Sequence, residues 1–114
     1  MNVIGWNSRD NTTQWILAEN NKAKVDLSQI TRIDFIIGGV TYSSNSLGQQ
    51  VIWWNSQVVY NGQNSDAVKF KIGKFGLNPG LYKCCRMVVY DNLNPNGLTW
   101  LSDISITLYR SDAP

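Results

Sequence analysis

Apolar and polar residues alternate with a period of two in several parts of this chain, and this pattern constrains the fold more than any other feature. In residues 31–37, T-R-I-D-F-I-I, the side chains of Ile33, Phe35 and Ile37 share one face of an extended chain. Residues 67–72 repeat the pattern, with apolar residues on one face and two lysines on the other. No stretch holds the helical apolar period of about 3.6 residues over several turns. The sequence therefore predicts a chain built of β-strands.

Turn signals separate the strand-like runs at short intervals. Gly38-Gly39 and Asn61-Gly62 can each adopt the positive φ that tight hairpin turns require. Residues 91–97, D-N-L-N-P-N-G, predict a polar loop before the last strand. Short strands with closely spaced turns are typical of a sandwich or a barrel. The predicted strands cover residues 14–18, 23–27, 31–37, 40–44, 51–60, 67–72, 80–90 and 98–109.

One domain accounts for the length of the chain, which has 114 residues. A chain of this length buries roughly two-thirds of the surface that its unfolded form exposes, so a single core can stabilise it. Charged residues make up only 16%, against about a quarter in average globular domains. We expect residues 1–114 to form a single domain, with residues 1–30 packing on it or reaching beyond it onto a neighbour.

Residues 77–82, L-N-P-G-L-Y, indicate which kind of sandwich the strands form. In immunoglobulin-like sandwiches a tyrosine near the start of a late strand turns its hydroxyl back onto the upstream backbone, an arrangement called a tyrosine corner. Pro79, Gly80 and Tyr82 have the form of that motif, and strand-like runs precede and follow it. The predicted fold class is therefore all-β, a single immunoglobulin-like antiparallel β-sandwich.

The only cysteines, Cys84 and Cys85, stand side by side in the strand that follows this motif. Cys84 comes two residues after the tyrosine, where antibody domains place a disulfide cysteine, but no earlier cysteine can pair with it. A bond between the two neighbours is disfavoured, because consecutive Cα atoms lie about 3.8 Å apart and disulfides span roughly 4.4 to 6.8 Å. We therefore expect a sandwich without a disulfide, in which Cys84 is a buried free thiol.

The residues that usually carry enzyme chemistry are scarce. The chain has no histidine, which is the commonest general base and a frequent zinc ligand. Adjacent strand residues such as Cys84 and Cys85 point to opposite faces, so they do not converge on one metal. Asp91 and Asp103 flank the last hairpin and are the carboxylates most able to approach each other, but we favour a role in capping the turn over a glycosidase pair. The sequence predicts no enzyme activity, no metal and no cofactor.

Charge and hydropathy argue against two classes of partner. The net charge is +2 and the pI about 8.6, with the basic residues scattered apart from Lys69, Lys71 and Lys74. Nucleic-acid-binding domains usually cluster such residues on one face. No apolar run approaches the roughly 18 residues of a membrane span, and the first residues lack the pattern of a secretory signal. We expect no nucleic acid and no membrane as partners, and synthesis in the cytoplasm.

Tryptophan is the other unusual component, with five residues in the chain. Trp53 and Trp54 are adjacent, so in a strand one of them faces away from the core. An outward tryptophan can bind a partner protein or stack on a sugar ring, unless the N-terminal segment covers it. We favour the protein interface, and the candidate contact residues are Trp53, Trp54 and Tyr60 together with Asn92, Asn94 and Asn96 of the 91–97 loop.

The order of these features resembles the small immunoglobulin-like virion proteins of tailed bacteriophages. The resemblance covers nearly the whole chain: I-G-W-N, T-R-I-D-F-I-I-G-G-V, V-I-W-W, V-K-F-K-I-G, L-N-P-G-L-Y, V-V-Y-D-N-L-N-P-N-G-L-T-W and I-S-I-T-L-Y. The adjacent cysteines are not part of that group's motifs. Members of the group serve as capsid decoration or cement proteins, or as accessory proteins of the head and tail.

This resemblance implies a non-enzymatic structural protein of the virion, without a cofactor, that binds the major capsid protein or another virion protein in many copies. Even a weak contact becomes effective when many copies bind a symmetric shell. Two alternatives remain open at this point. A tail or head-tail accessory protein would share the fold and differ in its location, and a carbohydrate-binding module would use the exposed tryptophans as a platform.

Overall fold

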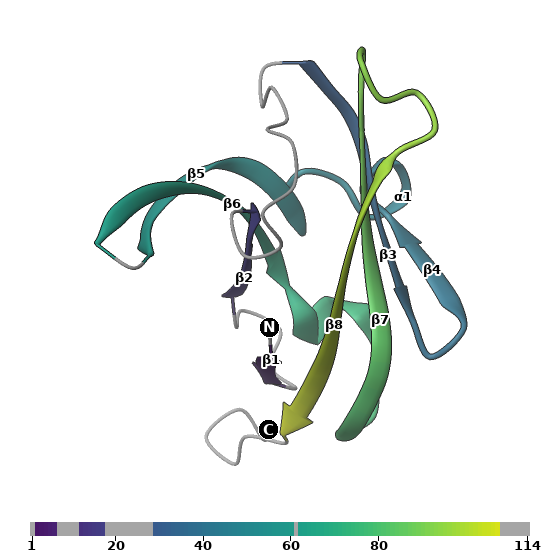
Figure 1. Cartoon of the computed structure of the whole chain (residues 1–114). Helices are drawn as coiled ribbons and strands as arrows, with labels where there is room; N and C mark the ends of the chain where they lie inside the picture. Colours follow the sequence, from purple (N-terminus) through teal and green to yellow (C-terminus); the bar gives the residue numbers. More distant parts are fainter. Residues whose placement is uncertain (1, 7–11, 18–28, 61, 108–114) are drawn as a thin grey trace.

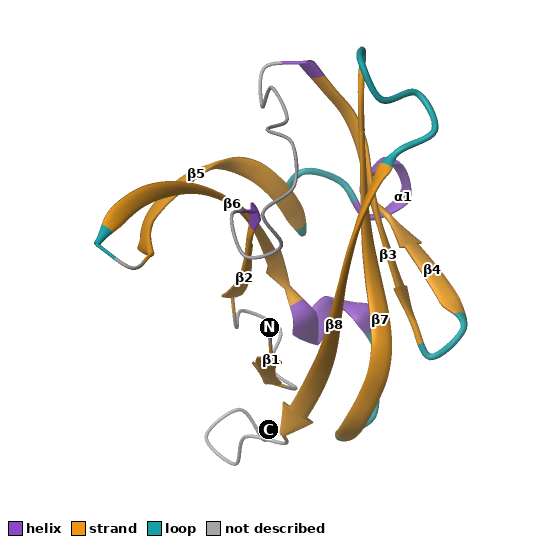
Figure 2. Cartoon of the chain, in the orientation of Figure 1, coloured by secondary structure: helices purple, strands orange, loops and turns teal. Residues whose placement is uncertain are grey.

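Two facing β-sheets carry most of the regular structure in the computed structural model of this chain, which describes residues 2–6, 12–17, 29–60 and 62–107 (Figure 1). The larger sheet contains β1 (Asn2–Trp6), β3 (Ile30–Ile37), β4 (Val40–Ser43), β7 (Gly80–Asp91) and β8 (Leu98–Thr107). The smaller sheet contains β2 (Thr12–Ile16), β5 (Ile52–Tyr60) and β6 (Gln63–Lys71). A helical turn, α1 (Ser44–Leu47), and a 3-10 turn, η3 (Ile72–Phe75), connect strands of different sheets (Figure 2).

The strand order is β1-β8-β7-β3-β4 in the larger sheet and β2-β6-β5 in the smaller one. Neighbouring strands run antiparallel, except that β1 pairs parallel with β8. Both cysteines are free. The structure is thus mostly β, with two sheets in a sandwich-like arrangement and no disulfide, and this part of the prediction is confirmed.

The predicted strands agree with the structure to different degrees. Residues 31–37, 51–60 and 80–90 match β3, β5 and β7 to within a residue at each end. The run at residues 67–72 is only the second half of β6. The strand predicted at residues 23–27 lies outside the described residues. Within residues 1–30, β1 and β2 pair with β8 and β6 of the same chain.

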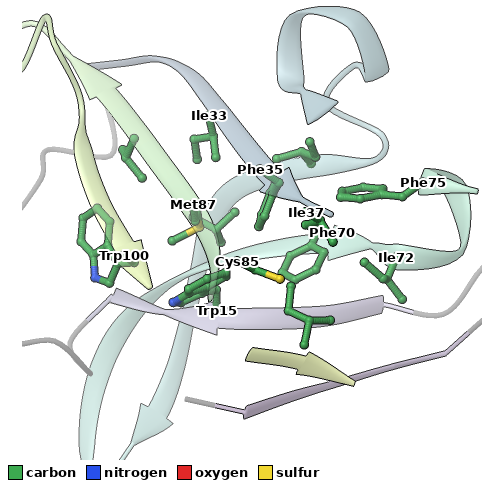
Figure 3. Packing of buried hydrophobic residues seen from close by; sticks show 14 of the residues in the cluster. Trp15, Ile33, Phe35, Ile37, Phe70, Ile72, Phe75, Cys85, Met87 and Trp100 are labelled. Carbon is green, nitrogen blue, oxygen red and sulfur yellow. The ribbon is translucent and has the colours of Figure 1, made fainter. Parts of the chain in front are cut away.

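The core lies between the two sheets and is centred on aromatic rings from both of them (Figure 3). The ring of Phe35 on β3 is fully buried, and its centroid lies 4.5 Å from that of Phe70 on β6 and 6.1 Å from that of Trp15 on β2. Phe75 of η3 lies 5.7 Å from Phe35 and stacks on Tyr42 of β4 at 4.9 Å. Burial of one such side chain is worth about 1.5 to 3 kcal/mol, so this cluster is a main contact between the sheets.

Two buried hydrogen bonds fix the edges of this core. The indole Nε1 of Trp100 on β8 donates to the carbonyl of Leu17, which follows β2, at 3.0 Å. The backbone N–H of Ile33 donates to Oγ of Ser44, the first residue of α1, at 2.9 Å. Ser44 thereby satisfies a strand donor beyond the end of β4, where an unpaired buried N–H would be costly.

Candidate binding surface

The hairpin of β7 and β8 exposes more large apolar side chains than any other part of the described chain. Three side chains there are more than half exposed: Leu81 at 60%, Leu93 at 77% and Leu101 at 56%. The other two such residues, Val40 and Val59, belong to different hairpins. A single exposed leucine is ordinary on a protein surface, whereas several on one element mark a candidate contact surface.

The loop between β7 and β8 is held by the carboxylate of Asp91, which is only 3% exposed. Its Oδ1 accepts hydrogen bonds from the backbone N–H of Leu93 at 3.0 Å and of Asn94 at 2.7 Å. The same oxygen accepts a third bond from Nδ2 of Asn94, at 2.7 Å. Because the loop backbone is bound to a buried side chain, Leu93 is displayed on a fixed turn rather than on a free loop.

The end of the loop packs back onto the outer face of the larger sheet. Gly97 has φ of +82° and approaches Val88 and Tyr90 so closely that an added Cβ would overlap Cγ1 of Val88. Val88 points to this outer face and is nevertheless 8% exposed. The loop therefore covers the sheet near its own end and leaves the rest of the β7–β8 outer face open.

The three candidate asparagines of this loop have different roles. Asn92 and Asn96 are exposed, as a contact role requires. Asn94 is half-buried and its side-chain amide is bound to Asp91. Sequence reasoning missed Leu93, although an apolar residue within the polar run D-N-L-N-P-N-G was a signal for it.

The adjacent tryptophans of β5 do not lie on this hairpin. Trp53 pairs with Lys69 on the outer face of the smaller sheet and is half-buried, so one of the two does face away from the core. Trp54 is also half-buried and packs against the core, because the alternation that turns Trp53 outward turns its neighbour inward. A contact role for Trp54 stays a prediction. The side chain of Tyr60 lies outside the described residues.

The tyrosine corner predicted from L-N-P-G-L-Y is confirmed. The hydroxyl of Tyr82 donates to the carbonyl of Asn78, four residues upstream, at 2.7 Å. Pro79 and Gly80 make the entry to β7 between these two residues, and Gly80 has φ of +151°, which suits glycine. The hydrogen bond fixes the path of the chain as it enters β7.

The prediction that Cys84 is a buried thiol was wrong. Tyr82 pairs with Ile104 and Cys85 pairs with Ser102, so β7 contains one residue more than β8 between these pairs. This bulge shifts the inward position from Cys84 to Cys85, which is 1% exposed, and leaves Cys84 exposed with φ of +57°. Oδ1 of Asp103 accepts the N–H of Cys84 at 3.0 Å in place of a ladder partner.

Iodoacetamide is expected to modify Cys84 alone in the folded protein and both cysteines after unfolding in urea. The thiolate is the nucleophile, and burial raises the pKa of the Cys85 thiol, which disfavours its thiolate as well as hiding its sulfur. Fragment-ion mass spectrometry of the 80–90 region distinguishes the neighbours. Modification of Cys85 before Cys84 would contradict the bulge.

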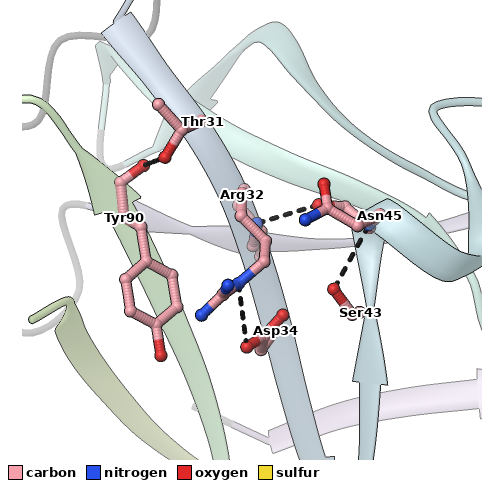
Figure 4. Close-up of polar contacts among 8 residues, drawn as sticks. Thr31, Arg32, Asp34, Ser43, Asn45 and Tyr90 are labelled. Carbon is pink, nitrogen blue, oxygen red and sulfur yellow. Dashed lines mark hydrogen bonds and ion pairs between the residues drawn. The ribbon is translucent and has the colours of Figure 1, made fainter. Parts of the chain in front are cut away.

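Polar contacts also order the outer face of the larger sheet where β3 lies beside β7 (Figure 4). Nε of Arg32 lies 3.2 Å from Oδ2 of Asp34, and its guanidinium carbon lies 4.1 Å above the ring of Tyr90. Hydrogen bonding to Tyr90, with a smaller effect of Asp34, raises the pKa of Arg32. Thr31 Oγ1 also donates to the carbonyl of Tyr90, at 3.3 Å. The charge of Arg32 is thereby balanced within the sheet.

Of the two carboxylates flanking the hairpin, Asp91 caps the turn as predicted, whereas Asp103 binds the backbone within the strand pair and not at the turn. Asp91 binds loop N–H groups and Asp103 binds the bulge. Among the residues that the structure describes, no group of three or more cysteine, aspartate or glutamate side chains is arranged to hold a metal ion. The described helices are all too short to cross a membrane.

Comparison with known proteins gives no match: no protein-family model, no curated protein and no solved structure is similar to this chain.

Proposed function

We propose that the sandwich is immunoglobulin-like. In that fold one sheet contains strands B, E and D, and the other contains G, F and C, extended by C′ in variable-type domains. The order β2-β6-β5 corresponds to B-E-D and the order β8-β7-β3-β4 to G-F-C-C′. The tyrosine corner at the start of β7 supports the same assignment, because it belongs at the start of strand F.

We further propose that the chain is a non-enzymatic structural protein of a virion, which binds the capsid surface as a decoration or cement protein. Leu93 carries this proposal: it is 77% exposed and is held on a loop that the buried Asp91 fixes. A fixed apolar side chain binds a partner without the entropic cost of ordering a loop. The resemblance to small immunoglobulin-like phage virion proteins supports the capsid as the partner, with the tail as the alternative location.

Many copies on a symmetric shell make a small contact of this kind sufficient. Burial of one leucine is worth about 1.5 to 3 kcal/mol, which is too little for a stable complex of two isolated proteins. A domain that contacts two adjacent subunits gains from the high effective concentration of the second site. The proposed contact residues are therefore Leu93, Asn92 and Asn96, whereas Trp53 lies on the opposite sheet and is left out of this contact.

Leu93→Asp is expected to weaken binding to capsid shells at least about tenfold, because it removes the leucine that the contact would bury and places a charge there. The probe is shells of the virus that encodes the chain, stripped of this protein, and the measurement is cosedimentation over a concentration series. Val40→Asp is the matched control, since Val40 is an exposed apolar residue at the far end of the larger sheet. Equal binding of wild type and Leu93→Asp, or no binding by wild type, would contradict the proposal.

A further inference from the structure

The outer face of β7 and β8 beyond the loop combines apolar and basic side chains. Leu101 pairs directly with Arg86 across the two strands, and Leu81 pairs with Ser105 further along. Between these two pairs lies the bulge, where Lys83 and Cys84 are both exposed. We call this set, Leu81, Lys83, Cys84, Arg86 and Leu101, the hairpin face.

The hairpin face has a net positive charge. Lys83 and Arg86 are exposed, and none of the described ion pairs includes either of them. The carboxylate of this face, Asp103 on β8, lies opposite the bulge and accepts the N–H of Cys84. On the neighbouring strand β3, the carboxylate of Asp34 is paired with Arg32, so it does not balance Lys83 or Arg86. Two cations thus lie among two exposed leucines, and the carboxylate described on this face is bound to the backbone of the bulge rather than to either cation.

We propose that the hairpin face binds an acidic protein surface, in which carboxylates surround an apolar patch. This inference rests on the proposed function and names the side of the chain that meets the shell and the chemistry of the shell surface. Complementary charge favours such a partner and speeds its association. A second copy of the chain fits poorly, because Lys83 and Arg86 of two hairpin faces would repel each other. The loop with Leu93 joins the two strands of the hairpin face. The same hairpin therefore presents the Leu93 contact and the hairpin face.

The native Cys84 reports directly on this contact. Its thiol is exposed on the hairpin face, and the buried Cys85 serves as an unreactive neighbour in the same peptide. Alkylation of Cys84 by iodoacetamide is expected to slow at least about tenfold when the protein is bound to stripped shells. An unchanged rate in the bound protein would overturn the inference.

Charge reversal gives a second, independent test. The double variant Lys83→Glu with Arg86→Glu is expected to weaken shell binding at least about tenfold in dilute salt, with a smaller loss at high ionic strength. Lys69→Glu with Lys71→Glu is the matched control, since it changes the net charge equally on the outer face of the smaller sheet. Equal losses in the two variants would show a general charge effect and overturn the assignment.

The outcomes separate this inference from the proposed function. Failure of the wild-type protein to bind shells would remove both. Shell binding with Cys84 still reactive would remove only the hairpin face. A dimer in sedimentation equilibrium that Leu101→Asp dissociates would assign the face to a second copy, and single-stranded DNA binding lost in the Lys83 and Arg86 variant would assign it to nucleic acid. Either result would overturn an acidic protein partner.

Discussion

Phe35→Ala is expected to lower the free energy of unfolding by about 3 to 5 kcal/mol. The ring is fully buried and contacts rings of the opposite sheet, with centroids 4.5 Å away at Phe70 and 6.1 Å away at Trp15. Its removal leaves a cavity between the two sheets that neither backbone can close without breaking its strand pairing. This loss is a large part of the about 5 to 15 kcal/mol that stabilises a typical domain.

Urea unfolding followed by tryptophan fluorescence measures this loss. Phe35→Leu is the second variant, because it keeps much of the volume and is expected to cost about 1.5 kcal/mol or less. It remains measurable if the alanine variant does not fold. Thr41→Ala, an exposed neighbour on β4, serves as the surface control and should change stability by no more than about 0.5 kcal/mol. If Phe35→Ala lowered the free energy of unfolding by no more than Thr41→Ala does, that result would contradict a core shared by the two sheets.

Gly97→Ala is expected to cost about 2 to 5 kcal/mol, the second largest effect. The left-handed backbone, at φ of +82°, contributes about 1 to 2 kcal/mol for a residue with a Cβ. The added Cβ would also overlap Cγ1 of Val88 and lie 3.0 Å from Cε2 of Tyr90, and overpacking of this kind costs about 1 to 3 kcal/mol. Both side chains belong to β7, which pairs with β3 on one side and β8 on the other, and Val88 is buried.

Gly39→Ala separates the two causes. Gly39 has nearly the same backbone angle, φ of +78°, but a Cβ there would meet nothing within 4 Å. Gly39→Ala should therefore lower the free energy of unfolding by only about 1 to 2 kcal/mol, the cost of the left-handed conformation. The double variant Gly97→Ala with Val88→Ala should cost less than the sum of its parts, since the second change removes the overlap. Equal costs at the two glycines would show that the loop does not pack on Val88.

Alternation and turn chemistry predict the main strands because they depend on local sequence alone. Ile33, Phe35 and Ile37 follow the period of two and are all fully buried. The tyrosine corner could also be predicted from local sequence, since L-N-P-G-L-Y contains the donor, the turn and the acceptor within six residues. Both features could be predicted without knowing which strands are neighbours.

The faces of the cysteines could not be predicted in this way. A regular strand that places Tyr82 inward also places Cys84 inward, and nothing in the sequence of β7 marks the extra residue. The bulge becomes visible only in the register of β7 against β8, where Asp103 satisfies the displaced N–H. One inserted residue reverses every later side chain, which is why Cys85, Met87 and Val89 face the core.

The binding surface was predicted in part for the same reason. Composition drew attention to the tryptophans, but burial depends on the neighbours of β5, and Trp54 packs against the core. The 91–97 loop was predicted to be polar, whereas the contact proposed for it depends on Leu93 and on the buried carboxylate of Asp91. A hydrogen-bond network that fixes a loop links residues through space, and sequence spacing alone does not reveal which side chain it displays.

The composition of virus particles tests the proposed function most directly. Particles of the virus that encodes this chain would be purified on a density gradient, and the chain would be quantified by mass spectrometry against the major capsid protein. A decoration or cement protein should be present in amounts comparable with the capsid protein. Amounts typical of a tail or portal component would move the chain to that location, and its absence from the particles would contradict a structural role in the virion.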